Sequence, residues 1–392
     1  MTRFLYRVLR ESGQFEAAVI VAATSSRDSA SVAVKSPTTW LGGPRVIEGV
    51  DRGLPYTHVG AWVTELEFQR YRPRRALDEI LEQFDILQFV TGAAPWAEVA
   101  RHVHKPKCLW VATTIKGDRS TRAKAGSFAR NLWSNMMMSV AEIYERRALK
   151  SADSVLALSP YTARSIARVL NKANDIPLAF CGVDTDLFAP RVTGPGRAEN
   201  KPYILCVARL FDARKNVMML LRAYASLACG RDDMPELRLV GEPLSDDAFK
   251  LLERLGIGDR VILTGPTHGE DLAALYRDAM FFVLPSDEEG LGIVILEAMA
   301  SGIAVISTAC GGPEVAVDDG ITGLLTPVRD QEALAEAMTR LIGDEQLRTR
   351  FGAAGREKAE KQFSLAASAD VFLRQYERLL PDSVSTPVGE LV

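Results

Sequence analysis

Two glutamates stand beside a glycine-rich turn in the second half of the chain. Glu289 precedes the turn Gly290-Leu291-Gly292, and Glu297 lies within the apolar run 293–300 that follows it. Glycine lets the backbone approach a ligand closely, and the exposed amides at a helix start favour an anion such as a diphosphate. We therefore predict that the amides from Gly290 to Ile293 bind a diphosphate.

The helix expected over 293–300 has apolar residues on every side and one carboxylate, Glu297. Such a helix is normally buried, so Glu297 needs hydrogen-bond donors, and ligand hydroxyls would serve. A rise of about 1.5 Å per residue puts the two carboxylates roughly 8–12 Å apart, one for each hydroxyl-rich end of a nucleotide sugar. The alternative is an ordinary connection in a parallel sheet, with Glu297 held by a neighbouring arginine.

The same stretch resembles the signature of glycosyltransferase family 4. Seven residues separate the two glutamates, and the motif continues as Ala298-Met-Ala-Ser-Gly302 and Gly311-Gly312-Pro313-Glu314-Val315. The resemblance covers residues 84–380 and is densest in the second half. It implies a retaining enzyme of the GT-B fold that uses a nucleotide-diphospho-sugar. Glu289 would then hold the sugar hydroxyls and Glu297 the ribose.

Two basic residues follow the strand expected over 203–207. In the resembled family an arginine and a lysine at this spacing bind the donor diphosphate, which assigns Arg209 and Lys215, with Arg214 as a competitor. Two fixed cations stabilise the charge that develops on a departing nucleoside diphosphate. With Glu289 they are the predicted catalytic residues, and the resemblance implies no protein nucleophile. The alternative is a pair of solvated basic residues in a loop.

The segment Asp184-Thr185-Asp186 has the Asp-x-Asp pattern of metal-dependent glycosyltransferases of another fold. Two aspartates at a turn are more often local capping groups than metal ligands. We therefore expect no metal ion and no cofactor besides the nucleotide-sugar substrate.

The first half departs from the family at one position. A histidine is expected after the strand 109–113, close to the transferred sugar, but Lys116 occupies that place. Lys116 is then expected to contact the donor diphosphate or the sugar hydroxyls, or to mark weakened activity.

Apolar runs alternate with helical periodicity along most of the chain, which is typical of βα units and parallel sheets. We expect two Rossmann-like, doubly wound domains facing across a cleft. Their expected spans are 1–188 and 189–364, with a polar linker over 189–202, a returning helix over 365–383 and a tail over 384–392. Expected strands cover 17–23, 86–90, 109–113, 154–157, 178–180, 203–207, 237–240, 261–264, 281–284, 304–307 and 323–325. The chain opens with a helix over 2–12 where GT-B domains usually have a first strand, so either that strand is absent from the protein or residues are missing upstream.

Composition sets the expected location and partners. The formal net charge is −3 over 392 residues, so we expect no nucleic-acid partner, and no apolar run is long enough to span a membrane. We expect a cytoplasmic protein with reduced cysteines. Residues 101–150 hold eleven Lys or Arg against three acids. A helix over 119–138 could use this charge to lie on the inner face of an anionic membrane, or it could be a core helix with a solvated basic face.

The function expected from these features is retaining, metal-independent transfer of a sugar to a glycan or lipid-linked acceptor, in bacterial surface or exopolysaccharide synthesis. Two alternatives remain open. One is a non-catalytic subunit that binds sugar nucleotides, and the other is a different GT-B enzyme such as a sugar-nucleotide epimerase.

Overall fold

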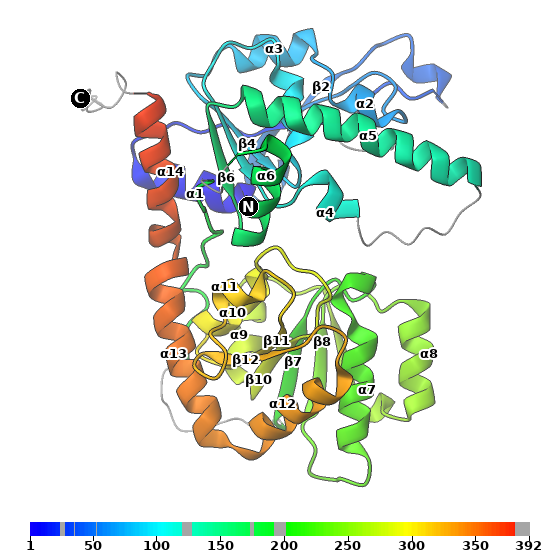
Figure 1. Ribbon diagram of the computed structural model, residues 1–392, viewed down its shortest axis with the longest axis vertical. Coiled ribbons are helices and arrows are strands. Elements are labelled where there is room, and N and C mark those ends of the chain that lie inside the picture. The colour runs from blue at the N-terminus through cyan, green and yellow to red at the C-terminus, as the bar shows by residue number, and fades with distance from the viewer. Residues whose placement is uncertain are drawn as a thin grey trace. The chain divides into compact units, whose positions relative to one another are not determined.

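The computed structural model describes residues 1–23, 28–34, 36–51, 53–119, 128–172, 176–191 and 201–380, without the side chains of Pro37, Glu67 and residues 118–119 and 128–135. The chain divides into two compact units (Figure 1). Unit 1 comprises Met1–Ala179 and the chain from Ala369 onward, and unit 2 is Phe180–Ser368. The boundary at Ala179 precedes the polar stretch 189–202, of which 192–200 lie outside the description.

Unit 2 is built on a six-stranded parallel sheet in the order β12-β11-β10-β7-β8-β9. Its strands are apolar and mostly buried on both faces, as the sequence indicates for a covered parallel sheet. They are β7 (Tyr203–Val207), β8 (Glu236–Val240), β9 (Val261–Gly265), β10 (Phe281–Leu284), β11 (Ala304–Thr308) and β12 (Gly323–Thr326). All six expected strands of this half are confirmed, with ends that differ by one residue at most.

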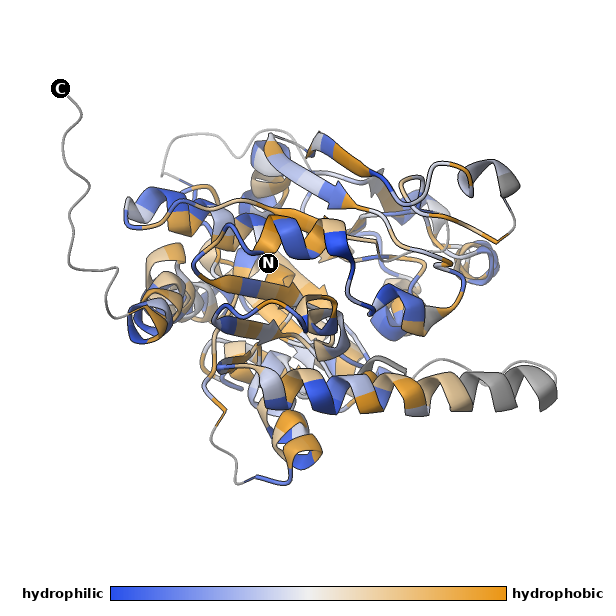
Figure 2. Cartoon of the chain, turned by 90° about the horizontal axis from the view of Figure 1, so that it is seen from above, coloured by the Kyte–Doolittle hydropathy of each residue, from blue (hydrophilic) through white to orange (hydrophobic). Residues whose placement is uncertain are grey.

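Helices connect these strands and cover the sheet. They are α7 (Val217–Ala228), α8 (Asp246–Leu255), α9 (Gly269–Asp278), α10 (Ile293–Ala300), α11 (Pro313–Ala316), α12 (Gln331–Gly343) and α13 (Glu345–Phe363). Figure 2 shows hydrophobic strand segments in the interior of the view, while the helices carry both hydrophobic and hydrophilic residues. The chain runs from β7 to β9 on one side and then crosses to β10 on the other. The order of strands therefore reverses between β7 and β10.

Unit 1 contains α1 (Thr2–Ser12) and two three-stranded sheets. The first has the order β1-β3-β2, from β1 (Ile20–Ala22), β2 (Val46–Asp51) and β3 (Leu54–Val59). The second has the order β4-β5-β6, from β4 (Leu87–Thr91), β5 (Lys107–Val111) and β6 (Ser154–Ala157). Its further helices are α2 (Glu67–Arg70), α3 (Arg75–Leu81), α4 (Ile115–Arg119), α5 (Phe128–Ser151) and α6 (Pro160–Leu170).

Unit 1 differs from the sequence-based expectation in two places. Strands β2 and β3 form an antiparallel hairpin that the sequence reading missed, and Gly53, with φ of 80°, provides the left-handed residue its turn needs. The strand expected over 178–180 is instead a single bridge between Leu178 and Ala157.

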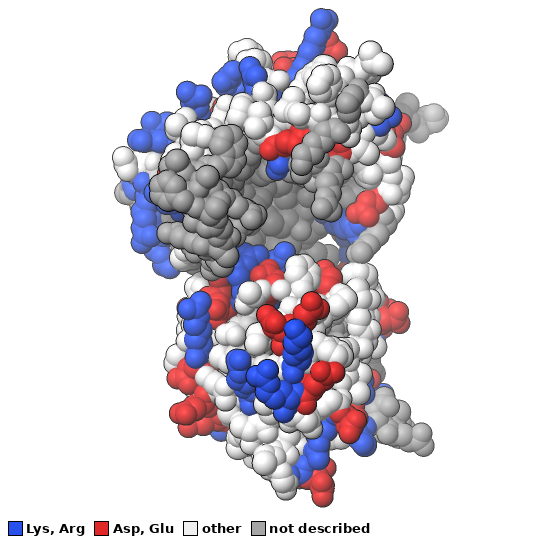
Figure 3. All heavy atoms as spheres, turned by 90° about the vertical axis from the view of Figure 1, so that its right-hand side faces the viewer, with Lys and Arg blue, Asp and Glu red and all other residues white. Residues whose placement is uncertain are grey.

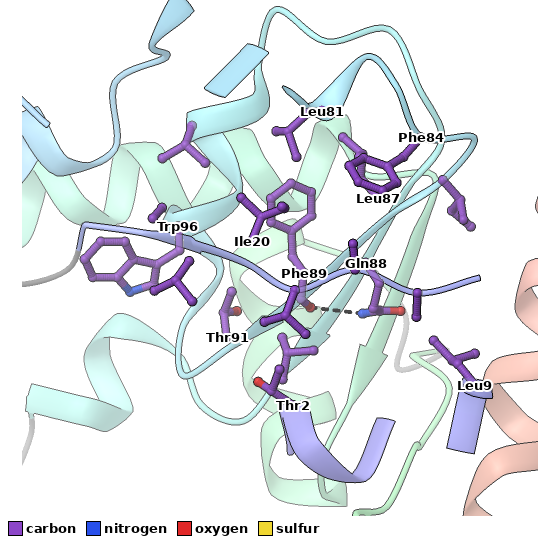
Figure 4. A pocket seen from close by; sticks show the side chains of 18 of the residues that line it. Thr2, Leu9, Ile20, Leu81, Phe84, Leu87, Gln88, Phe89, Thr91 and Trp96 are labelled. Carbon is purple, nitrogen blue, oxygen red and sulfur yellow. Dashed lines mark hydrogen bonds between the residues drawn. The ribbon is translucent and has the colours of Figure 1, made fainter. Parts of the chain in front are cut away.

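A cavity of about 430 Å³ lies beside β1 and β4 (Figure 4). Every residue of 15–22 and of 86–92 contributes to its lining, together with Leu77, Trp96, Tyr376 and others. Side chains alternate between the two faces of a strand, so a cavity against one face would meet every second residue. A lining of consecutive residues indicates that the cavity follows the edges of both segments. We call it the edge cavity, and no strand of the described chain occupies it.

The helix α14 (Leu365–Leu379) carries aromatic residues into the core of unit 1. The Phe372 ring lies 4.7 Å from that of Trp110 on β5 and 6.2 Å from that of Phe4 on α1. The Tyr376 hydroxyl donates to Oε1 of Gln88 over 2.8 Å. These contacts join the C-terminal part of the helix expected over 365–383 to the core of unit 1.

The charge distribution and the helix lengths bear on the partners of this protein. Basic and acidic side chains intermingle on the face of unit 2 drawn in Figure 3. A mixed surface of this kind exerts little long-range attraction on a polyanion. Among the described residues, no helix has both the length and the apolar character needed to cross a bilayer.

Candidate functional site

The loops that follow β7 and β10 are joined where the strand order of unit 2 reverses. The backbone amide of Asp287 donates to the carbonyl of Arg214 over 2.7 Å, and Nδ2 of Asn216 donates to Oδ1 of Asp287 over 2.9 Å. In open α/β sheets, ligands bind outside the carboxyl ends of the strands at this reversal point. We call residues 208–216 and 285–292 the switch-point loops. They contain all the predicted site residues except Ile293, Glu297 and Lys116.

Lys215 and Glu289 form an ion pair across the two loops. Their side chains are only 13% and 12% exposed, and Oγ of Ser286 also donates to Oε1 of Glu289 over 3.2 Å. A charged pair so far from water attracts more strongly than a surface pair. The sequence predicted both residues for the site, and the fold brings them into direct contact.

Arg209 and Arg214 share one carboxylate, that of Asp212. Arg214 binds it with two nitrogens, Nε at 3.2 Å and Nη2 at 2.9 Å, and Nη2 of Arg209 lies 3.1 Å from Oδ2. Burial raises the pKa of Asp212, but the two guanidiniums outweigh it and leave that pKa below its ordinary value. Arg209 is 53% exposed and Arg214 only 30%. Arg209 is thus the guanidinium more accessible to a ligand.

The glycine turn is held by close backbone packing. Gly292 has a φ of 78° and precedes the first residue of α10. At Gly312, an added Cβ would lie 2.5 Å from the carbonyl oxygen of Glu289 and 2.7 Å from the carbonyl carbon of Gly290. The second motif, Gly311-Gly312-Pro313, therefore packs directly against the backbone of residues 289–290 and fixes its position.

Glu297 on α10 has a partner that the sequence reading missed. Oη of Tyr276, on α9, donates to Oε2 of Glu297 over 2.8 Å. The alternative of a neighbouring arginine is wrong, because the phenol takes that place. Burial raises the pKa of Glu297 to about 7, and the hydrogen bond from Tyr276 lowers it in part. Tyr276 shares the buried face of α9 with Leu272 and Ala273. A tyrosine on the apolar face of a helix needs a hydrogen-bond acceptor, and this requirement is the sequence feature from which a buried partner could have been predicted.

The Asp-x-Asp segment forms a local turn. Oδ1 of Asp184 accepts from the backbone amides of Asp186 at 3.2 Å and Leu187 at 3.1 Å. Arg356 of α13 donates to the carbonyl of Thr185 over 2.9 Å. Within the described ranges, no three His, Cys, Asp or Glu residues gather as metal ligands.

Lys116 belongs to α4 in unit 1. Its side chain is 74% exposed, and Nζ lies 3.7 Å from Oε2 of Glu142 on α5. The predicted contact with the donor diphosphate or the sugar hydroxyls remains a prediction.

Solved structures with similar folds show which fold the chain has. Sucrose-phosphate synthase from Thermosynechococcus elongatus matches with a TM-score of 0.73 and 23% identity, over 97% of this chain and 92% of that chain. Anabaena Alr3699/HepE, solved in complex with UDP and glucose, matches with a TM-score of 0.66 and 18% identity, over 83% and 86%. The fold is GT-B.

Sequence comparison then shows which family the second half of the chain resembles. The model for "Glycosyl transferases group 1" matches residues 193–358. A GDP-mannose-dependent alpha-(1-6)-phosphatidylinositol monomannoside mannosyltransferase of Mycobacterium tuberculosis is 33% identical over 258 residues, 62% of this chain and 66% of that protein. A D-inositol 3-phosphate glycosyltransferase of Corynebacterium aurimucosum is 31% identical over 264 residues, 63% and 61%. The match thus spans slightly less than two thirds of either relative. Residues 193–358 of the chain match the group 1 glycosyl transferases.

Proposed function

We propose that the protein is a retaining glycosyltransferase that needs no metal ion and moves a sugar from a nucleotide-diphospho-sugar to a glycan or lipid-linked acceptor. The observation that carries this proposal is the meeting of Lys215 and Glu289 at the strand reversal of unit 2. A cation for the diphosphate and a carboxylate for the sugar stand there beside a glycine turn and a helix start.

The bond changes define the tasks of these residues. The bond between the anomeric carbon and the diphosphate oxygen breaks, and the acceptor oxygen bonds to that carbon on the same face. The departing oxygen takes the acceptor proton, so the products are a glycoside and a nucleoside diphosphate. Arg209 and Lys215 stabilise the charge that grows on the leaving diphosphate, which lowers the barrier.

The two glutamates bind the two ends of the donor. Glu289, already bonded to Lys215 and Ser286, accepts from hydroxyls of the transferred sugar. Glu297 accepts from the ribose hydroxyls, and the amides from Gly290 to Ile293 bind the diphosphate between them. Carboxylates that accept from hydroxyls discriminate strongly against ligands that lack them.

The names of two relatives support the acceptor class. One is named for a phosphatidylinositol monomannoside and the other for inositol 3-phosphate. We propose a related acceptor here, a lipid-linked sugar or a growing glycan at a membrane face. Two exposed apolar residues of α5, Met136 and Ile143, are seven residues apart and share one face of that helix. They suit a peripheral contact with an anionic bilayer.

A donor screen tests the proposal. The full chain is incubated with GDP- and UDP-sugars and with lipid-linked or oligosaccharide acceptors, with and without EDTA. We expect release of a nucleoside diphosphate, a product with the anomeric configuration of the donor by NMR, and no loss of activity in EDTA. An inverted product or a strict requirement for a divalent cation would contradict the proposal.

A second candidate, a non-catalytic subunit that binds sugar nucleotides, is favoured by one observation. Lys116 stands where the family pattern places a histidine, and it pairs with Glu142. Donor binding without turnover on any acceptor would support the subunit. Release of a 2-epimer without transfer would instead indicate an epimerase.

A further inference from the structure

Tyr276 is the one residue outside α10 that holds the carboxylate of Glu297 in the described part of the chain. Its side chain is completely buried, and its Oη lies 2.8 Å from Oε2 of Glu297 and 3.2 Å from the carbonyl oxygen of Val294. A phenol has a single proton to donate, and a bond to an ionised acceptor is the stronger of the two. The hydroxyl is therefore committed mainly to the carboxylate.

The ring of Tyr276 is fixed by its neighbours. The Phe188 ring meets it edge-on at 5.7 Å, and the Phe282 ring of β10 lies tilted at 5.7 Å. A ring packed from two directions holds its hydroxyl in one place. The carboxylate that it binds is held with it, because the hydrogen bond joins Oε2 of Glu297 to a hydroxyl that has one position.

The two oxygens of Glu297 consequently differ. Oε2 is bonded to Tyr276, whereas Oε1 has no hydrogen bond within the ranges that the structure describes. The side chain of Glu297 is only partly buried, so one oxygen is available to a ligand. A carboxylate has about four acceptor sites, which is enough for a tyrosine and two vicinal hydroxyls together.

We propose that Tyr276 is a positioning residue, whose hydroxyl orients Glu297 so that the free oxygen accepts from the ribose hydroxyls of a nucleoside diphosphate. This inference rests on the proposed function, which assigns Glu297 to the ribose. Tyr276 acts from a separate helix and does not itself meet the ligand.

The test compares two variants and two ligands. Tyr276→Phe removes the hydroxyl and keeps the ring. Tyr224→Phe is the matched control, because Tyr224 is equally buried in unit 2 and its hydroxyl donates only to the carbonyl of Pro235, over 2.7 Å. Each protein is titrated calorimetrically with GDP and UDP and with their 2′,3′-dideoxy analogues, which lack the ribose hydroxyls.

We expect the wild-type protein to prefer the ribose form of at least one diphosphate by about ten-fold or more, the scale of a charged hydrogen bond. In Tyr276→Phe most of that preference should vanish, through weaker binding of the ribose form alone. Tyr224→Phe should keep it. A purely structural role would weaken both forms equally and overturn the inference.

The same titration separates this inference from the proposed function. If the wild type binds ribose and dideoxy forms equally, or binds neither nucleotide, the assignment of Glu297 to the ribose is wrong and both fail. If the wild type discriminates and Tyr276→Phe discriminates as well, only the role of Tyr276 is wrong.

Discussion

At the residue scale, the ion pair of Lys215 and Glu289 connects the two predicted roles of the site. Each charge is the other's main partner while neither meets a ligand, and both are nearly buried. Removing one member leaves the other without compensation, which is costly away from water. In the proposed function, a bound diphosphate would give Lys215 a second anion, and Glu289 would then have oxygens free for sugar hydroxyls.

A first prediction concerns the cations. Lys215→Ala and Arg209→Ala should lower kcat by about 10²–10³-fold and donor affinity much less, because charge on the leaving group grows in the transition state. Single-turnover rates and donor Kd values separate the two effects. The control is Arg231→Ala, a basic residue paired with Asp233 away from the switch-point loops. Equal losses in kcat and in affinity would contradict the assignment.

A second prediction concerns Glu145 of α5, which accepts from the backbone amide of Ile115 over 2.9 Å. Burial raises its pKa from 4.5 to about 7. Between those values the folded chain holds a proton that the unfolded chain has released. Glu145 therefore makes the free energy of unfolding fall as pH rises, with the loss complete above about 7.

Glu145→Gln keeps an oxygen acceptor and removes this titration. The fall in unfolding free energy between pH 5 and pH 8 should shrink by about 1–3 kcal/mol relative to the wild type. Urea unfolding at the two pH values measures it. Glu142→Gln removes a nearby charge, 33% exposed, that also raises the pKa of Glu145, so it should shrink the fall by much less than Glu145→Gln does. A fall of the same size in the Glu145 variant would show that another group causes it.

At the scale of elements, the site depends on one loop packing onto another. Gly312 has a φ of −91°, which suits any residue, so only its contact with the 289–290 backbone requires glycine. Backbone atoms cannot turn aside as a flexible side chain can. A methyl group there must displace the loop that carries Glu289.

A third prediction follows for Gly312→Ala. Overpacking of this kind costs about 1–3 kcal/mol, and donor affinity should fall about ten-fold while circular dichroism stays unchanged. The matched control is Gly343→Ala, where an added Cβ meets nothing within 4 Å. Unaltered donor binding in the Gly312 variant would show that the loop accommodates the change.

A fourth prediction concerns α5 and the residues before it. The helix expected over 119–138 contains four cations that would meet an anionic membrane, Arg119, Arg122, Lys124 and Arg130. Their side chains, like those of Phe128, Leu132 and Trp133, lie outside the described part of the structure. Met136 and Ile143 are described and are 48% and 54% exposed. Binding to anionic vesicles should fall with salt, because surface charges are screened over about 8–10 Å near physiological ionic strength.

Replacing the four cations with Gln should abolish vesicle binding and leave donor binding intact, since each contributes only about 1 kcal/mol. The double variant Met136→Ser and Ile143→Ser should weaken vesicle binding as well. Vesicle binding of the wild type that ignores salt, or Trp133 fluorescence that lipid does not change, would favour a core helix.

At the scale of the whole molecule, the two units differ in how far the sequence predicts them. Apart from the exposed edge strand β9, the strands of unit 2 are largely buried on both faces, so they read as apolar runs between helices. Strand β2 of unit 1 is largely exposed along its length and carries charged residues at Glu48 and Asp51, so no apolar run marks it. Its pairing with β3 comes from the turn at Gly53, a weaker signal.

The site shows the same division. Local motifs predicted Lys215, Glu289 and Glu297, because chemistry there depends on residue type and short spacing. Other contacts of the site depend on how side chains pack. These are the ion pairs of Asp212 with two arginines and the hydrogen bond from Tyr276 to Glu297. Tyr276 stands 21 residues before its partner and on another helix. Such a contact exists only after the helices pack, so no sequence spacing announces it.

A fifth prediction concerns the edge cavity of unit 1. The amide of Leu87 donates to the carbonyl of Pro106, and the carbonyl of Thr91 accepts from the amide of Ala112, both on the β5 side. Because backbone groups alternate along a strand, the amides of Gln88 and Val90 point the other way, toward the cavity. Those two amides should exchange with solvent hydrogen faster than that of Phe89. NMR exchange rates on the full chain measure this. Equal protection of all three would show that something already pairs with this edge.

Strands with one free side are templates for other strands, which is how soluble proteins come to aggregate. Among the sheet-edge strands in the described part of unit 1, β1 and β4 line one apolar cavity, where the side chains are only partly buried while those of β5 are almost fully so. The protein should therefore self-associate through this face, and the associated fraction should rise with protein concentration. The same opening is where a grafted β-strand could be inserted to make the protein more soluble.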